Sequence, residues 1–155
     1  MTFTKELKIP FDGNQLILDD SYTEIEFGAF NNYVDAESII LGNGITELPP
    51  LCFSNFSYLK KIKLPAALKN ISGKAFDGCI LIEEIELPAA VEQIGFSAFS
   101  GCKSLKKINL SDTKISKIEK ECFLSCSSLE ESSRFPDSYI RKKHLARLLQ
   151  GNPAK

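Results

Sequence analysis

The sequence predicts a repeat solenoid, in which short parallel strands of successive units stack into a sheet, and three observations lead to this prediction. The segment 62–79 recurs almost unchanged 23 residues later, at 85–102. The same period extends in both directions and divides residues 16–131 into five units. Finally, each unit carries more apolar residues on one side than it can bury alone, whereas stacked units bury them against each other.

The five units cover residues 16–38, 39–61, 62–84, 85–107 and 108–131, and the last has one extra residue between Leu110 and Ile115. Eight positions are apolar in every unit, which gives forty apolar residues in a chain that is 43% hydrophobic. In the 62–84 unit these positions are Ile62, Leu64, Leu68, Ile71, Ala75, Phe76, Cys79 and Ile82. We expect all eight columns, including the phenylalanines at 30, 53, 76, 99 and 123, to point inward.

Each unit begins with a short strand. The pattern Leu105-Lys-Lys-Ile-Asn-Leu110 places its last two apolar residues two apart, on one face of a strand, and Pro65, Pro88 or Ser111 ends the strand in its unit. Neighbouring strands then lie about 4.8 Å apart in a parallel sheet. Later in the unit a turn requires a backbone with positive φ, for which glycine and asparagine are suited, and the residues there are Asn32, Asn55, Gly78 and Gly101.

The unit resembles the leucine-rich repeat of the BspA-like class, with its pattern Leu-x-x-Ile-x-Ile-Pro…Val-x-x-Ile-Gly…Ala-Phe-x-x-Cys. Units 62–84 and 85–107 match it almost residue for residue, and the resemblance covers residues 16–131. It implies an α/β-type repeat solenoid, a right-handed leucine-rich-repeat array with a parallel β-sheet on its concave face. It also implies a protein-interaction or adhesion role, since members are commonly surface or secreted proteins of bacteria and protists, and it implies no enzyme activity.

Residues 1–155 are expected to form one domain whose two ends are capped. At the N-terminus, residues 1–15 form a β cap: 7–11 and 15–18 flank Asp12-Gly13, a hairpin signal that pairs a capping strand with the first repeat. At the C-terminus, residues 132–155 form a helical cap, because residues 139–150 have the periodicity of an amphipathic helix that Gly151 and Pro153 end.

Few residues suit catalysis or metal binding. The chain has one histidine, His144, and five cysteines with no pair at the two-residue spacing of a zinc knuckle or redox motif. Cys79, Cys102 and Cys126 share one repeat position and are expected to stack as a column of buried thiols, small hydrophobes rather than ligands. Asn55, Asn70 and Asn109 match the glycosylation sequon, a short pattern with many false positives. We therefore expect no enzyme activity, no metal and no cofactor.

A function is then expected on the exposed positions of the predicted sheet. Three lysines on one strand are followed by three glutamates on the next, so that Lys61, Glu84, Lys107 and Glu131 should form a cross-strand ladder of alternating charge. Nearer the N-terminus, Ile17 and Ile40 are expected to form a modest exposed apolar patch. The candidate partner-binding residues are Ile17, Glu37, Ile40, Lys60, Lys61, Lys63, Glu83, Glu84, Glu86, Lys106, Lys107 and Asn109.

The leading hypothesis is protein–protein interaction or adhesion through this face, with an unknown protein partner. One alternative is a peripheral membrane or nucleic-acid tether that uses the basic C-terminal helix with Arg141, Lys142, Lys143 and Arg147; another is a self-associating structural unit. The net charge of −1 and the alternating ladder provide no continuous positive stripe, so nucleic acid and membranes are unlikely partners.

Charge is distributed unevenly along the chain. Residues 1–59 carry two lysines against nine acidic residues, whereas 132–155 carry six basic residues against Asp137 alone. Because exposed charges more than about 8 Å apart are largely screened at physiological salt, we expect a monomer in ordinary buffer. The segment Met1–Leu7 lacks the apolar stretch of a signal peptide, so the sequence as it stands predicts a cytoplasmic location unless a leader was removed.

Overall fold

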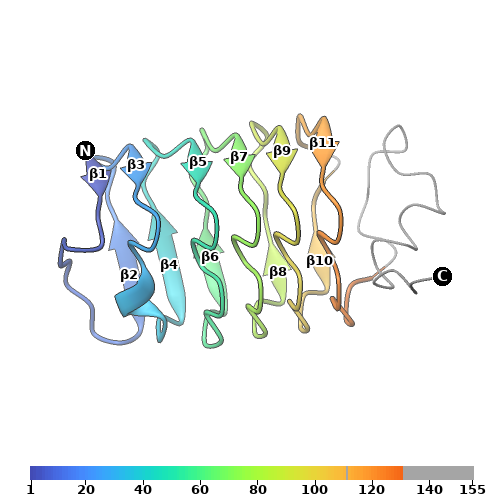
Figure 1. The fold of residues 1–155 in the computed structure, drawn as a ribbon, viewed down its shortest axis with the longest axis horizontal. Helices are drawn as coiled ribbons and strands as arrows, with labels where there is room; N and C mark the ends of the chain where they lie inside the picture. The colour runs from blue at the N-terminus through green and yellow to red at the C-terminus, as the bar shows by residue number, and fades with distance from the viewer. Residues whose placement is uncertain (111, 131–155) are drawn as a thin grey trace.

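The computed structural model describes residues 1–110 and 112–130, which form a parallel-strand β-solenoid of about five turns (Figure 1). Every turn of the solenoid contributes one strand to each of two rows. The even-numbered strands form the even-strand face, and the odd-numbered strands form the odd-strand face, so that the chain passes from one face to the other and back in each repeat. Between the two rows lies one continuous core of buried side chains.

The even-strand face contains β2 (Gln15–Leu18), β4 (Ser38–Leu41), β6 (Lys61–Lys63), β8 (Glu84–Ile85) and β10 (Lys107–Ile108). The odd-strand face contains β1 (Thr2–Phe3), β3 (Glu24–Ile25), β5 (Glu47–Leu48), β7 (Asn70–Ile71), β9 (Gln93–Ile94) and β11 (Lys117–Ile118). One short 3-10 helix, η1 (Asn31–Tyr33), is the only helix in the described part of the chain. The sequence analysis predicted the even strands but did not predict the odd strands.

All strand pairs are parallel, and their register follows the 23-residue period. In the even row β2, β4 and β6 form one sheet, in which Leu16 pairs with Ile39 and Ile39 with Ile62. A second sheet joins β8 to β10, with Glu84 opposite Lys107. Within the described part of the chain β6 and β8 are not paired, so the even-strand face is divided at this point.

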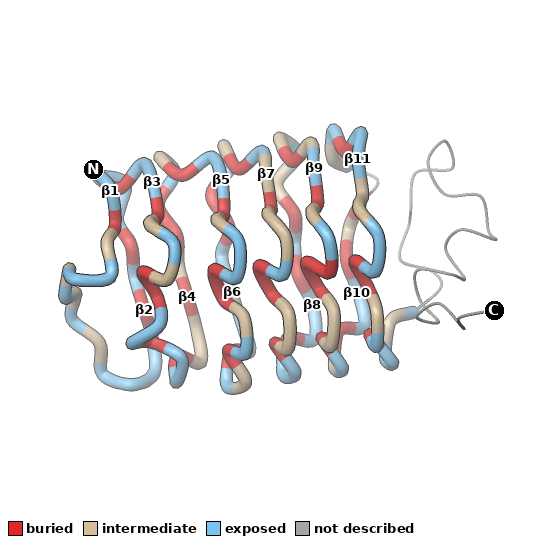
Figure 2. The backbone as a smooth tube through the Cα atoms, viewed as in Figure 1, coloured by how far each residue is buried: buried red, intermediate tan, exposed pale blue. Residues whose placement is uncertain are grey.

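The core confirms the predicted inward positions. All but three of the forty repeated apolar residues are buried, and the three exceptions, Ile62, Ile118 and Leu129, are half-buried against the same core (Figure 2). The five phenylalanines form a continuous column whose neighbouring ring centroids lie 4.9 to 5.6 Å apart. One apolar cluster therefore runs the length of the described repeats, as expected for units that cannot bury their apolar side alone.

A ladder of hydrogen bonds joins successive repeats between the odd strand and the next turn. The backbone N–H of Phe53 donates to the carbonyl of Ala75 at 2.7 Å, and that of Phe76 donates to Ala98 at the same distance. Positive φ accompanies this ladder at two places in repeats two to five and at one place in the first repeat. The predicted positions Asn55, Gly78 and Gly101 have it, whereas Asn32 lies in η1 and does not. The sequence analysis missed the other place, where the left-handed residues are Gly28, Leu51, Lys74, Ser97 and Glu121.

The N-terminal cap differs from the predicted hairpin. Asp12 and Gly13 do form a turn, in which Asp12 Oδ1 accepts hydrogen bonds from the backbone N–H groups of Asn14 and Gln15, and Gly13 has a φ of +88°. Residues 7–11, however, form no strand. The capping strand is β1, which pairs in parallel with β3 on the odd-strand face. The hairpin prediction is therefore wrong, because the chain caps the solenoid by extending its own parallel pattern.

The predicted C-terminal helical cap over 132–155 lies outside the described residues, as do Glu131 and the basic residues Arg141, Lys142, Lys143 and Arg147. The tether hypothesis depends on that segment. Among the described residues, no helix has the length and hydrophobicity needed to cross a membrane.

Candidate functional site

The even-strand face presents the charged side chains that the repeat register assigns to it. The buried positions of each strand alternate with outward positions, and side chains of lysine and glutamate occupy the latter in strand-by-strand order. Of the candidate partner-binding residues, Glu37, Ile40 and Asn109 are half-buried, and the others are exposed: Ile17, Lys60, Lys61, Lys63, Glu83, Glu84, Glu86, Lys106 and Lys107. The structure thus brings the candidate residues together on one face.

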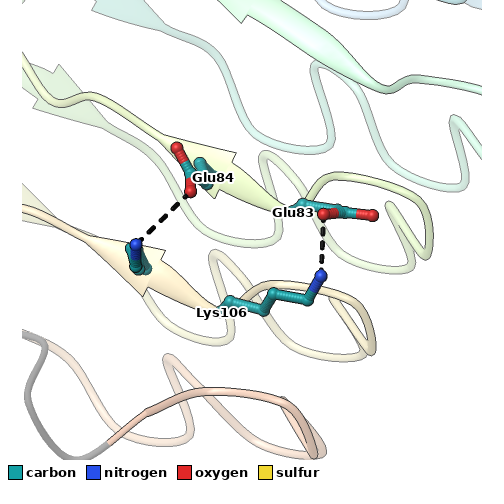
Figure 3. Close-up of polar contacts among 4 residues, drawn as sticks. Glu83, Glu84 and Lys106 are labelled. Carbon is teal, nitrogen blue, oxygen red and sulfur yellow. Dashed lines mark hydrogen bonds and ion pairs between the residues drawn. The ribbon is translucent and has the colours of Figure 1, made fainter.

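Ion pairs on this face join Lys60, Lys106 and Lys107 to glutamates of the preceding repeat. Lys60 Nζ lies 2.7 Å from Glu37 Oε2, and Lys106 Nζ lies 2.8 Å from Glu83 Oε2 (Figure 3). The hydrogen bond to Glu83, reinforced by the charge of that carboxylate, raises the pKa of Lys106. These side chains are about half exposed, so solvent screens each pair and its contribution to stability is small.

The predicted ladder forms only in part. Lys107 Nζ approaches Glu84 Oε1 to 3.8 Å, as the strand register requires, but no ion pair within 4 Å joins Lys61 to Glu84, and Glu131 lies outside the described residues. The closer pairs belong to the adjacent row that contains Glu37, Lys60, Glu83 and Lys106. The predicted ladder breaks at Lys61, where β6 and β8 are not paired by backbone hydrogen bonds among the described residues.

Three charged side chains beside this division take part in no ion pair among the described residues: Lys61, Lys63 and Glu86. Two adjoining open depressions lie over the same strands. One, of about 530 Å³, includes Lys61, Glu84 and Lys107 in its lining. The other, of about 670 Å³, has an apolar floor with Ile62 and Leu87 and is bordered by Lys63 and Glu86. This part of the face is hollow, and its side chains Lys61, Lys63 and Glu86 form no ion pair with another described residue.

The apolar patch is smaller than expected. Ile17 is 53% exposed on β2, but Ile40 on β4 is half-buried and not exposed. The difference follows from strand order, because β4 lies between β2 and β6 and both neighbours cover its flanks. The exposed apolar contribution of the even-strand face therefore comes chiefly from Ile17.

Asn109 has a structural role instead of an open binding position. Its Oδ1 accepts a hydrogen bond from the backbone N–H of Leu87 at 2.7 Å, and its Nδ2 donates to the carbonyl of Leu87 at 3.3 Å. The side chain thereby completes the backbone hydrogen bonding where β8 ends. Asn109 is also the first residue of a glycosylation sequon, and its side-chain amide is engaged in this internal contact.

The thiol column forms as predicted, with all five cysteines free and buried. Cys79, Cys102 and Cys126 donate hydrogen bonds from Sγ to the carbonyls of Phe53, Phe76 and Phe99, at 3.0 to 3.2 Å. Burial raises the pKa of Cys79 to about 12, so that the side chain remains a neutral thiol at ordinary pH. Within residues 1–110 and 112–130, no group of three or more metal-ligating side chains is placed to hold a metal ion.

The odd-strand face contains a polar surface that sequence reasoning missed. A shallow depression of about 220 Å³ includes Glu47, Asn70, Gln93 and Lys117 in its lining, one residue from each of four neighbouring strands. These residues share one repeat position, so their stacking could have been found from the period once the second row of strands was expected. The sequence analysis assigned strands only to the even row.

Comparison with protein families finds one match. The sequence model of the BspA type leucine rich repeat region matches residues 23–143 with six copies. The matched range extends past residue 131, the end of the fifth unit counted from the sequence. No curated protein matches the sequence.

Solved structures of bacterial leucine-rich-repeat proteins have a similar fold. The protein from T. pallidum matches with a TM-score of 0.63 and 24% identity, over 77% of this chain and 52% of that one. One from Bacteroides ovatus has a TM-score of 0.61 and 30% identity, over 76% and 36%. A leucine-rich cell surface protein from Faecalibacterium prausnitzii has a TM-score of 0.56 and 34% identity, over 61% and 24%. This chain therefore spans about half of the first relative and smaller parts of the others.

Proposed function

Because this chain belongs to the family of the BspA type leucine rich repeat region, we propose that it is a non-catalytic protein-interaction or adhesion module that binds its partner through the even-strand face. Members of this family are generally interaction or adhesion modules. The similar Faecalibacterium prausnitzii protein is described as a cell surface protein, which supports the adhesion variant of the proposal.

The observation that carries the proposal is the contrast between paired and unpaired charges on this face. Lys60, Lys106 and Lys107 each lie within 4 Å of a glutamate, and a partner that bound them would compete with that contact. Lys61, Lys63 and Glu86 have no ion pair among the described residues and surround the depressions over β6 and β8. A protein partner can therefore pair with them while the internal ion pairs remain intact.

The shape of this region suits a polypeptide. The depressions are open and shallow, with an apolar floor at Ile62 and Leu87 and charged margins, and Ile17 is exposed on the same row of strands. A mixture of apolar centre and polar rim is typical of transient protein interfaces. Electrostatic complementarity at such a rim contributes to specificity and association rate.

A selection experiment tests the proposal. Peptides or small domains that bind the full chain are selected from a display library, and each independent binder is measured against two double variants. Lys61→Glu/Lys63→Glu reverses the unpaired charges of the even-strand face, while Lys69→Glu/Lys114→Glu makes the same charge change at exposed lysines outside it.

We expect most binders to lose at least about tenfold in affinity with the first variant, as loss of more than one charged contact produces, and to retain affinity for the second. Binders that respond equally to both variants, or that lose affinity only with the second, would contradict the proposed binding face. Thermal unfolding of both variants checks that each remains folded.

A further inference from the structure

The even-strand face lacks one rung of the backbone ladder that joins its repeats. At the start of β4, β6 and β10, the backbone N–H of Glu37, Lys60 or Lys106 donates to a carbonyl one repeat earlier, at 2.7 or 2.8 Å. Within the described residues, Glu83 makes no such bond to Lys60 at the step from β6 to β8. On the odd-strand face, β5, β7, β9 and β11 form one unbroken sheet. The rung is therefore missing on one side of the solenoid only.

The core is also least closed at this step. Ile62 on β6 is half-buried, whereas the matching residue of each other repeat is buried. Leu64 is 8% exposed, and its counterparts in the other repeats are at most 2% exposed. The two depressions of about 530 and 670 Å³ lie over the same strands. Backbone, core and surface thus locate one opening, which we call the crevice and define by residues 61–64 and 84–87.

Opposite charges face each other across the crevice. The 23-residue register sets three lysines opposite three glutamates: Lys60 and Glu83, Lys61 and Glu84, and Lys63 and Glu86. None of these three pairs approaches within 4 Å. The side chains that do form ion pairs here form them away from the crevice, with the repeats on either side of it. The attraction across the crevice is therefore unused in this structure.

The third pair, Lys63 and Glu86, depends on the crevice alone. On its other side Lys63 is paired with Ile40, and the register places Asn109 beside Glu86, so neither has another charged neighbour in its row. Both side chains are exposed and line the larger depression. If β8 moves toward β6, these two side chains meet, because side chains at matching positions of neighbouring strands interact.

We propose that the crevice opens and closes, and that its closure regulates the partner binding proposed above, on which this regulation rests. In the closed state the Glu83 N–H donates to the Lys60 carbonyl and the three charge pairs form. In the open state, which this structure shows, Lys61, Lys63 and Glu86 are available to a partner. The unbroken odd-strand sheet is the hinge. A partner that binds only the open state shifts the equilibrium toward it, and closure lowers the apparent affinity.

Amide hydrogen exchange of the full chain without a partner tests the closure. Salt screens the attraction across the crevice, so the amide of Glu83 should exchange at least about threefold more slowly at about 20 mM salt than at about 500 mM. The amide of Lys106, which is already bonded to the carbonyl of Glu83, should show no such change. Equal exchange of Glu83 at the two salt concentrations would overturn the closure.

Charge variants test the pair that faces across the crevice. Lys63→Glu and Glu86→Lys, each alone, place like charges opposite each other and should remove the low-salt protection of Glu83. The exchanged pair Lys63→Glu/Glu86→Lys restores the attraction and should regain the protection, which also shows that the variants fold. Lys69→Glu, at an exposed lysine outside the face, is the matched control and should leave it unchanged. Loss of protection in the control, or none regained with the exchanged pair, would contradict the closure.

A reversible crosslink tests the regulation. Lys60→Cys/Glu83→Cys, oxidised with glutathione disulfide, holds the crevice shut and keeps the three unpaired charges, while the five native cysteines are buried. Binders that depend on the even-strand face should lose at least about tenfold in affinity on oxidation and regain it on reduction. Glu83→Cys/Lys106→Cys, across a step that is already bonded, is the control and should not change their affinity.

The outcomes separate the two proposals. Binding that ignores the first crosslink overturns the regulation, and a disulfide that forms only in the control overturns the closure. If no selected binder uses the even-strand face, the proposed function fails, whereas the hydrogen exchange of the protein alone still decides whether the crevice closes.

Discussion

In the repeats from residue 62 onward, the rings of Phe76, Phe99 and Phe123 lie nearly parallel, at interplanar angles of 3° and 8°, whereas Phe30 and Phe53 in the first two repeats are inclined to each other by 33°. The residue three positions after each phenylalanine accounts for the difference. From Cys79 onward it is cysteine, but in the first two repeats it is Tyr33 or Phe56. Phe53 and Phe56 meet nearly at right angles, at 81°.

The comparison shows that the size of the residue three positions after each phenylalanine affects how the phenylalanine rings pack on one another. A cysteine is small enough for successive phenylalanines to adopt the same orientation, and its thiol donates to the phenylalanine carbonyl of the preceding repeat. An aromatic residue at that position fills more volume and favours edge-to-face contact. The surfaces of the early and later repeats also differ. Most exposed large apolar residues lie in repeats one to three, whereas in repeat four Lys106 and Lys107 form ion pairs.

The largest expected effect comes from removal of a stacked ring. Phe76→Ala and Phe99→Ala should each lower the free energy of unfolding by about 3–5 kcal/mol, because each leaves a cavity in a fully buried column. Denaturant unfolding measures the change. Phe96→Ala is a matched control, since that ring is 45% exposed and should cost far less. A loss of under about 1 kcal/mol at Phe76 or Phe99 would show that the column does not hold adjacent repeats together.

A second substitution makes the early repeats resemble the later ones. Phe56→Cys supplies the residue that the repeat pattern favours, but we expect it to destabilise the protein by about 2–4 kcal/mol, because the neighbouring rings are packed around an aromatic side chain. Chemical denaturation measures this, with the exposed Tyr58→Cys as the control. Unchanged or higher stability would mean that the rings of the first two repeats readily adopt the parallel arrangement.

The buried thiols predict a pH dependence at high pH. Burial raises the pKa of Cys79 from 9.0 to about 12, so the folded protein keeps its proton over a range in which the unfolded chain loses it. The contribution to stability is complete below pH 9 and is lost as pH rises from 9 to 12, at about 1.4 kcal/mol per pH unit for one thiol. In the Cys79→Ala variant, the free energy of unfolding should therefore fall less steeply with pH between 9 and 12, by the contribution of one thiol. Equal slopes for the two proteins in this pH range would contradict the assignment.

The smallest expected effects are those of the surface ion pairs. Lys60→Ala and Lys106→Ala should each lower the free energy of unfolding only slightly, because both partners of each pair are largely exposed, and the loss should shrink at high salt. Lys61→Ala, which breaks no ion pair, is the matched control and should leave stability within about 0.5 kcal/mol. Unfolding at two salt concentrations measures all three. A salt-independent loss at Lys60 would indicate that its aliphatic stem, and not its charge, stabilises the protein.

The sequence predicted which side chains of the candidate face point outward, but only some of the contacts that they make. The period identifies Lys61, Lys63 and Glu86 as outward residues, because a strand alternates its side chains between two faces. The sequence could not show that β6 and β8 are not paired within the described residues, or that the amide of Asn109 binds the backbone of Leu87. Both are contacts between neighbouring repeats, and their geometry is not recorded in the residue pattern.

The sequence by itself determined the period of the solenoid, the parallel register at steps of 23 residues, and which side chains enter the core. Each of these follows from one physical requirement, that a unit with too much apolar surface must stack on its neighbours. The tertiary structure alone decided the parallel β1 cap, the second row of strands and the left-handed backbone at Leu51, Lys74 and Ser97. At those places the local residues have no strong preference, and hydrogen bonds to chain segments more than twenty residues away select the conformation.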